Sequence, residues 1–163
     1  MGLDLSATML SAVPGPCVRG DAIHLPFRSG SLGSVAALYV LYHLADPREA
    51  IAESYRVLRP GGLFVAATPS RYNDPELADV LPTSPPSTFD AEIAPSLVRE
   101  FFQNIEVESW DAPLIHLPHV TAVVTYLIGR GLKATEAEAA ARRVGAPLTL
   151  TKRGSLIYGY KAA

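Results

Sequence analysis

Two short apolar runs, residues 35–39 and residues 63–68, mark the first half of the chain. Uninterrupted runs of this length predict strands that are covered on both faces. Residues 47–58 between them place apolar side chains at helical spacing, and Asp46 and Pro47 supply a cap and a suitable first helical position. Because a strand, a helix and a strand joined by short links form a right-handed unit with parallel strands, the pattern predicts an α/β protein.

The flanking segments predict further elements. Leu3 ends a short apolar piece, a helix covers residues 7–12, and an extended piece follows from Cys17 to Gly20. Residues 69–95 are rich in Pro, Ser and Asp, which predicts a loop that covers a site. The later pattern predicts a helix over 97–102, an edge strand over 105–110, helices over 120–128 and 136–144, and strands over 148–151 and 156–160 that flank a turn. We expect one partial domain over residues 1–163, with a helical insertion at about 113–146.

Composition narrows the functional class. Of the 163 residues, 48% are hydrophobic and 18% are charged, and the formal net charge is −2. No basic run is present, so nucleic acid is an unexpected partner. A single cysteine, Cys17, leaves no intrachain disulfide or multi-cysteine metal site. Neither a membrane span nor a signal peptide is evident, which favours a cytoplasmic protein that does not bind membranes.

Four features then occur in a fixed order: Asp4 after a short apolar piece, Gly20-Asp21, the segment His43 to Pro47, and Leu58-Arg-Pro-Gly-Gly62. This set resembles the class I S-adenosylmethionine (SAM)-dependent methyltransferases, small-molecule branch, from their second strand onward. The resemblance implies a Rossmann-like, mostly parallel sheet with helices on both faces and an antiparallel last strand. It also implies SAM as cofactor and a small-molecule acceptor. One departure is Leu32-Gly33, where relatives often carry Phe-Asp.

Asp4 is the first candidate for cofactor binding. Ligands of doubly wound sheets bind where strands end, and a carboxylate there can accept hydrogen bonds from both ribose hydroxyls. The resemblance assigns Asp4 and the adjacent Leu5 to the cofactor. Alternatively, Asp4 only joins Ser6 in capping the helix over residues 7–12.

Asp21 and Ala22 form the second candidate pair. The resemblance places this aspartate near the adenine amino group and the next backbone N–H near the ring. A neutral adenine edge offers one donor and one acceptor, which a carboxylate and an amide N–H can match. The alternative is a turn aspartate that bonds only to its own loop.

Leu38, Tyr39 and His43 follow the apolar strand over residues 35–39. Leu38 could line the cofactor pocket with its backbone, and the Tyr39 ring could pack on the cofactor or meet its sulfonium charge. Equally, Tyr39 could simply fill the core. His43 is the candidate catalytic base, because an imidazole titrates near neutral pH; the alternative is a structural histidine bonded to a loop carbonyl. The histidines show no metal-ligand spacing, so no metal is expected.

The family's first strand and its glycine-rich loop, which hold the methionine part of the cofactor, have no counterpart in this sequence. Without that strand, two strand edges would be unpaired. We therefore expect the isolated chain to bind SAM weakly or not at all, as a truncated methyltransferase. The competing hypothesis is a non-catalytic Rossmann-like module for binding or dimerisation, with a homodimer formed through the unpaired sheet edge. Trp110, Tyr126 and Leu127 are candidate acceptor-lining residues, although ordinary packing of the helices is the favoured alternative for them. Because the segments 69–95 and 110–146 carry no cluster of Lys or Arg, an apolar or amphipathic acceptor is favoured over a polyanion.

Overall fold

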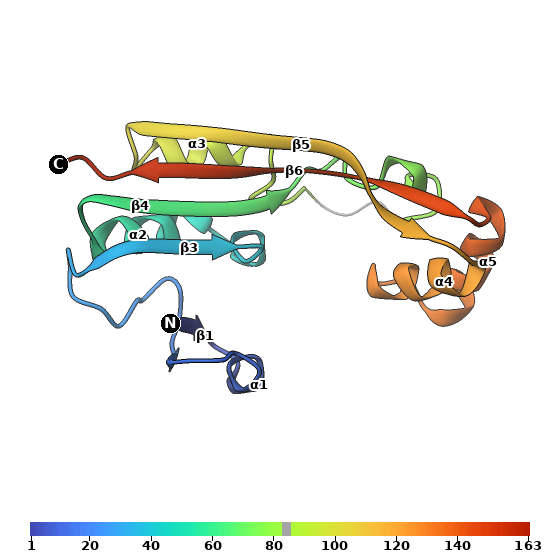
Figure 1. Cartoon of the computed structure of the whole chain (residues 1–163), viewed down its shortest axis with the longest axis horizontal. Helices are drawn as coiled ribbons and strands as arrows, with labels where there is room; N and C mark the ends of the chain where they lie inside the picture. Colours follow the sequence, from blue (N-terminus) through green and yellow to red (C-terminus); the bar gives the residue numbers. More distant parts are fainter. Residues whose placement is uncertain (83–85) are drawn as a thin grey trace.

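The computed structural model describes residues 1–82 and 86–163, which form two separate β-sheets with flanking helices (Figure 1). The smaller sheet pairs β1 with β2, and the larger has the strand order β3-β4-β6-β5. The strands are β1 (Gly2–Asp4), β2 (Cys17–Arg19), β3 (Leu32–Leu38), β4 (Leu58–Pro69), β5 (Asn104–Leu117) and β6 (Leu148–Tyr160). The helices are α1 (Ala7–Ser11), η1 (Leu41–His43), α2 (Pro47–Val57), η2 (Pro75–Leu77), α3 (Ala94–Arg99), α4 (Val120–Gly129) and α5 (Ala134–Val144).

The strand directions match the predicted α/β class. β1 and β2 are parallel, as are β3 and β4, while β6 runs antiparallel between β4 and β5. The helix between β3 and β4 begins as the sequence predicts, with the Asp46 side chain accepting a hydrogen bond from Arg48 N at 3.0 Å and Pro47 in the first turn. A mixed α/β fold with a mostly parallel sheet flanked by helices and an antiparallel last strand is confirmed.

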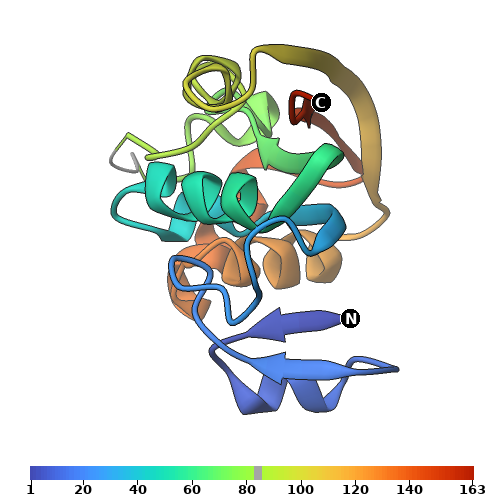
Figure 2. The same cartoon turned by 90° about the vertical axis from the view of Figure 1, so that its left-hand side faces the viewer.

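The main core lies between the larger sheet and the helices α2 and α3, which pack on one of its faces (Figure 2). Phe64 of β4 and Phe102, just after α3, stack with ring centroids 5.2 Å apart, and Tyr55 of α2 meets Phe102 edge-on. Such aromatic pairs stabilise a core beyond the area that they bury. These contacts fix α2 and α3 relative to the middle of β4.

The opposite face of β3 is open. Ala37 is buried against α2, but Ala36 is exposed and Leu38 retains 55% of its accessible surface. The prediction that the strand over residues 35–39 is covered on both faces is therefore wrong. Its apolar run cannot report which face a helix covers, because small alanines fit either environment.

The last two strands form a long ribbon that extends beyond the main core (Figure 1). The prediction of two strands around a turn at 152–155 is wrong, because β6 is continuous and Lys152, Arg153 and Gly154 pair with residues 110–112 of β5. The ribbon ends in the helical hairpin α4–α5, close to the predicted helices over 120–128 and 136–144.

This outer part, which we call the cap, has a core of its own. Leu117 and Leu150 of the ribbon, Leu77 of η2, and Val123 and Leu127 of α4 are buried together. Because this core is separate from the one beneath the sheet, the cap is a compact unit placed past the carboxyl end of β4. No described helix combines the length and the apolarity that crossing a membrane requires.

Candidate functional site

Asp4 lies at the carboxyl end of β1, where its side chain makes one local contact. Its Oδ1 accepts a hydrogen bond from Ser6 N at 2.7 Å, while the α1 cap is Ser6, whose Oγ accepts from Met9 N at 3.3 Å. Oδ2 of Asp4 makes no hydrogen bond among the described residues. Leu5 beside it is 60% exposed. The half-buried carboxylate thus keeps one oxygen for a ligand, and the turn contact does not exclude the binding role.

Asp21 and Ala22 follow β2, where Gly20 N donates to Asp4 O at 3.1 Å and links the two segments. Oδ1 of Asp21 accepts from Ile23 N at 3.1 Å, so the predicted turn contact exists. Within the part of the chain that the structure describes, neither Oδ2 of Asp21 nor the Ala22 N–H has a hydrogen-bond partner. One acceptor and one donor therefore remain free side by side.

The loop that carries Asp21 is fastened to α2. Leu25 N donates to Glu53 at 2.8 Å, and Arg56 donates to the carbonyls of Phe27 and Leu25. Ala22 also packs against the main core, which includes Leu41 of η1. These contacts join the end of the smaller sheet to the segment that carries His43, although β1 and β3 share no strand pairing.

Leu38 and Tyr39 end β3 in an exposed position. Tyr39 has a left-handed backbone (φ 54°), which costs a residue with a side chain roughly 1–2 kcal/mol. Its N–H donates to Ala67 O at 2.9 Å, which holds it against β4. Tyr39 is 50% exposed and Leu38 is 55% exposed, so the alternative that Tyr39 fills the core is wrong.

His43 is exposed at the end of η1, with its ring 4.4 Å from that of Tyr42. The imidazole makes no hydrogen bond to a loop carbonyl among the described residues, so the structural alternative is not seen. The carbonyls of Tyr42 and Leu44 instead accept from Thr88 Oγ1, the latter at 2.8 Å. This contact ties the histidine loop to the wall of a neighbouring pocket.

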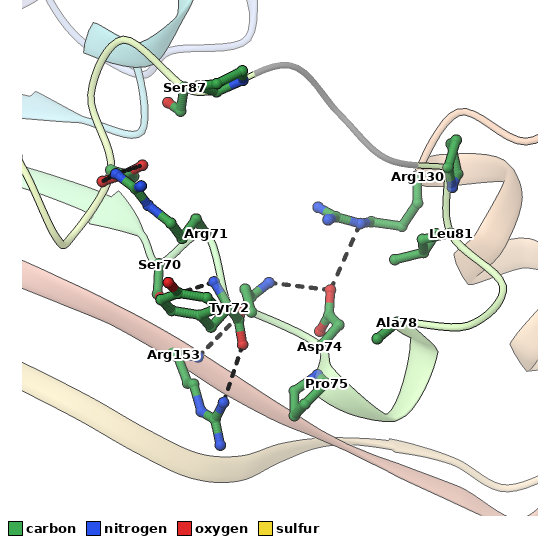
Figure 3. Close-up of a pocket in the computed structure, with 14 residues that line it drawn as sticks. Ser70, Arg71, Tyr72, Asp74, Pro75, Ala78, Leu81, Ser87, Arg130 and Arg153 are labelled. Carbon is green, nitrogen blue, oxygen red and sulfur yellow. Dashed lines mark hydrogen bonds and ion pairs between the residues drawn. The ribbon is translucent and has the colours of Figure 1, made fainter.

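That pocket has a volume of about 600 Å³ and opens past the end of β4, facing the cap (Figure 3). One wall is the segment Ser70 to Pro75, and others come from the end of α4 and the middle of β6. Its described lining residues are Ser70, Arg71, Tyr72, Asn73, Asp74, Pro75, Ala78, Leu81, Pro82, Pro86, Ser87, Asp90, Arg130 and Arg153. Most of this lining comes from the segment predicted as a loop over 69–95, which η2 interrupts and of which residues 83–85 lie outside the described residues; its role as a site cover stays a prediction.

Charged groups in the pocket are arranged in pairs. Arg71 lies 2.9 Å from buried Asp90, and their hydrogen bond raises the pKa of the arginine. Asp74, whose side chain is fully buried, contacts Lys152 at 2.7 Å and accepts from Tyr126 Oη at 2.8 Å. Burial raises the pKa of Tyr126, so this hydroxyl stays protonated as a donor.

The acceptor-lining residues predicted from sequence are only partly placed at a pocket. Trp110 lines a second, more open pocket of about 350 Å³ next to Ser70 and Tyr72. Tyr126 reaches the larger pocket only through its bond to Asp74, and Leu127 is fully buried in the cap core, so its predicted lining role is wrong. Helical spacing alone could not show which face of α4 packs inward.

Sequence reasoning missed Asp74, Arg71, Arg130 and Arg153. They come from segments as much as 82 positions apart, and only folding of the ribbon over the loop unites them. The one local signal was the Asn73-Asp74-Pro75 turn. Turn aspartates of this kind are common, so this signal alone does not indicate a binding site. Among residues 1–82 and 86–163, no group of three or more His, Cys, Asp or Glu residues could hold a metal ion.

Comparison with known proteins supplies the family context. Residues 1–66 match the methyltransferase domain family. An uncharacterised chloroplastic methyltransferase of Arabidopsis thaliana is 53% identical over 51 residues, which cover 31% of this chain and 14% of that protein. The demethylmenaquinone methyltransferase of Lactiplantibacillus plantarum is 33% identical over 91 residues, covering 49% of this chain and 38% of that enzyme. The chain therefore spans well under half of the curated relatives that it matches.

Solved structures extend the likeness to the whole fold. A SAM-dependent methyltransferase from Thermotoga maritima, described as a possible histamine N-methyltransferase, gives a TM-score of 0.65 at 18% identity over 99% of this chain and 72% of its own. A Haloferax volcanii protein solved in complex with the Trm112 methyltransferase activator gives 0.59 at 20% identity, over 99% and 71%. At these identities the likeness concerns the fold.

Proposed function

We propose that this chain, which resembles the class I SAM-dependent methyltransferases in the sequence of residues 1–66 and in its fold, acts in methyl transfer from SAM to a small-molecule acceptor. The observation that carries the proposal is the set of free polar atoms on Asp4, Asp21 and Ala22, joined by the main core to the segment that carries His43. SAM is the methyl donor of this family, and when bound it supplies a methyl group already activated by its sulfonium charge.

The residues present fit the nucleoside part of SAM. The free Asp4 oxygen suits a ribose hydroxyl, and the free oxygen of Asp21 with the Ala22 N–H matches the donor and acceptor of an adenine edge. The exposed Leu38 and Tyr39 offer apolar surface for the cofactor at the end of β3. The left-handed backbone of Tyr39 supports this role, since strained residues gather at functional sites.

The remaining side chains act on the acceptor. The pocket past β4 holds it, and its wall is bonded to the His43 loop through Thr88. His43 is exposed at the end of η1 and takes a proton from the acceptor oxygen or nitrogen as it is methylated. A positioned base of this kind contributes about 10²- to 10⁴-fold to a rate, so His43→Asn lowers methyl transfer without weakening SAM binding.

Binding of SAM by this chain is weak in the proposed account. Asp4 and Asp21 belong to the smaller sheet, Tyr39 and His43 to the larger, and no strand pairing joins the two sheets within the described residues. Ordering the two parts on a ligand costs free energy that a continuous sheet would not require.

Saturation-transfer NMR on the intact chain with SAM tests the proposal directly. We expect strong transfer to the adenine and ribose protons and weak transfer to the methionine methylene protons, because the assigned residues address the nucleoside. Asp21→Asn should reduce the adenine signals, while Asp79→Asn, an exposed aspartate, should not. Uniform saturation transfer to all SAM protons, no saturation transfer at all, or a D21N spectrum identical to that of the wild type would count against the proposal.

The second candidate is a non-catalytic module that binds a partner or dimerises through an unpaired strand. Among the described residues β3 pairs only with β4, and it is exposed at Ser34, Ala36 and Leu38, which favours edge-to-edge association. Sedimentation velocity across a concentration series distinguishes the two. Self-association abolished by Ala36→Lys, with no SAM-dependent signal in the NMR experiment, would favour this module.

A further inference from the structure

The pocket past β4 is lined by both apolar and charged side chains. Its apolar residues are Pro75, Ala78, Leu81, Pro82 and Pro86. Three arginines and two aspartates from β6, from the end of α4 and from the loop after β4 join them in the lining. A pocket built this way favours a molecule with an apolar body and a polar end.

The cations of the lining differ in how closely they are paired. Arg71 is paired with Asp90 at 2.9 Å and with Glu92 at 3.5 Å, and Arg153 is paired with Asp111 at 3.0 Å outside the lining. Asp74 is compensated by Lys152 at 2.7 Å, which is closer than Arg130 at 3.6 Å. Among the described residues, the only carboxylate near Arg130 is that of Asp74, and Asp74 lies closer to Lys152. Arg130 is therefore the least compensated cation of the pocket.

Arg130 is also placed to meet a ligand. It caps the carboxyl end of α4, and Figure 3 shows its side chain extending into the pocket toward the segment of Ser70 and Arg71. Its side chain remains 43% exposed, and its guanidinium makes no hydrogen bond to the described residues. Residues 83–85, Thr-Ser-Pro, add no ionisable group to the charge balance.

We propose that this pocket binds an amphipathic small molecule with a single anionic group, which Arg130 holds, and whose apolar part lies on Pro75, Ala78 and Leu81. A planar guanidinium binds a carboxylate through two parallel hydrogen bonds, which makes the contact selective as well as strong. The inference rests on the proposed function only in identifying this molecule with the methyl acceptor.

The same pocket disfavours a polyanion. Asp74 and Asp90 are both buried in the lining, and each is neutralised by a cation of the protein. A second anionic group on the ligand would have to compete with these internal pairs. Of the cations around the pocket, Arg130 has the most distant carboxylate, so it is the group that a single anionic group of a ligand would pair with.

The test uses the intact chain without SAM, so that it does not depend on methyl transfer. Calorimetric titrations compare 3-phenylpropionate with 3-phenylpropionamide, which share one size and apolar body and differ in charge. We expect the carboxylate to bind about tenfold more tightly than the amide. Arg130→Gln should remove that preference, and Arg130→Lys should retain part of it.

Arg142→Gln is the matched control, because Arg142 also lies in the cap near a carboxylate, Glu138 at 3.7 Å, but is 76% exposed. It should leave the preference unchanged, and urea unfolding should show that R130Q keeps the stability of the wild type. A preference that survives in R130Q, or no preference in the wild type, would overturn the inference. Carboxylate selectivity in a chain that fails to bind SAM would refute the methyltransferase proposal while leaving this one standing.

Discussion

Asp74 and Lys152 form a 2.7 Å ion pair that joins the loop after β4 to the cap ribbon, with side chains 0% and 23% exposed. Tyr126 Oη of α4 completes the contact, lying 2.8 Å from Asp74 and 3.0 Å from Lys152 Nζ. One buried carboxylate thereby connects three segments that line or support the pocket.

Removing the cation of this pair leaves a buried charge with weaker compensation. Lys152→Met should lower the free energy of unfolding by about 3 kcal/mol, measured by urea denaturation. Arg142→Gln, whose ion pair with Glu138 is exposed, should change it by no more than roughly 0.5 kcal/mol. Equal stability of K152M and the wild type would show that the Asp74 contacts do not hold the cap.

Tyr126→Phe removes one hydroxyl and leaves the ion pair intact. We expect a loss of about 1–2 kcal/mol in unfolding free energy, because Asp74 loses a hydrogen-bond donor in a buried place. Since burial raises the pKa of Tyr126, the difference between Y126F and the wild type should stay constant from pH 6 to pH 9. A difference that disappears within this range would contradict a protonated, buried hydroxyl.

Two glycines provide a matched test of packing in the ribbon and the cap. A methyl group at Gly154 would overlap the Trp110 ring and approach Thr68 O to 2.6 Å, whereas one at Gly129 in α4 would meet nothing within 4 Å. Gly154→Ala should cost about 2 kcal/mol or more, and Gly129→Ala should be neutral or stabilise by up to about 1 kcal/mol. Thermal melts of both variants check this, and similar midpoints would contradict the close approach of β5, β6 and β4.

Glu53 makes the attachment of the Asp21 loop dependent on pH. The hydrogen bond from Arg56 is the main cause that lowers the pKa of Glu53 below its usual 4.5, and the bond from Leu25 N adds to it. A lowered folded-state pKa gives stability that is present above the unfolded value and is lost as the pH falls through the folded one.

The wild type should therefore exceed Glu53→Gln in urea midpoint at pH 6, and the difference should shrink steadily below pH 4.5. Glu49→Gln, on an exposed position of the same helix, is the control and should show no such trend. A constant gap between E53Q and the wild type down to pH 3 would mean that the carboxylate charge does not hold the loop.

The sequence predicted the local features well and the long-range ones poorly. Asp46, Pro47 and the apolar runs predicted the β3-α2-β4 unit because caps and periodicity act within a few residues. Continuity of β6 through Lys152 to Ser155 was missed, since its turn-like residues are held extended by pairing with β5, a tertiary effect. The candidate residues Asp4, Asp21, Tyr39 and His43 came from a resemblance, and the structure adds which of their atoms are free.

The arginines of the pocket could not be predicted at all. Arg71, Arg130 and Arg153 are far apart in the sequence and meet only in the folded chain. The expectation that no cationic cluster faces the acceptor was based on each sequence segment by itself, so it could not include them. The structure gathers them but pairs two with carboxylates, which retains the preference for an amphipathic molecule over a polyanion.

Calorimetric titration of SAM into the intact chain and its Asp4→Asn variant tests the central claim most directly. The account predicts a dissociation constant weaker than about 100 µM for the wild type and a further loss of about tenfold in D4N, with Asp79→Asn unchanged. Low-micromolar binding by the wild type would contradict a site divided between two sheets. Equal affinity in D4N would contradict the assignment of the Asp4 carboxylate to the cofactor.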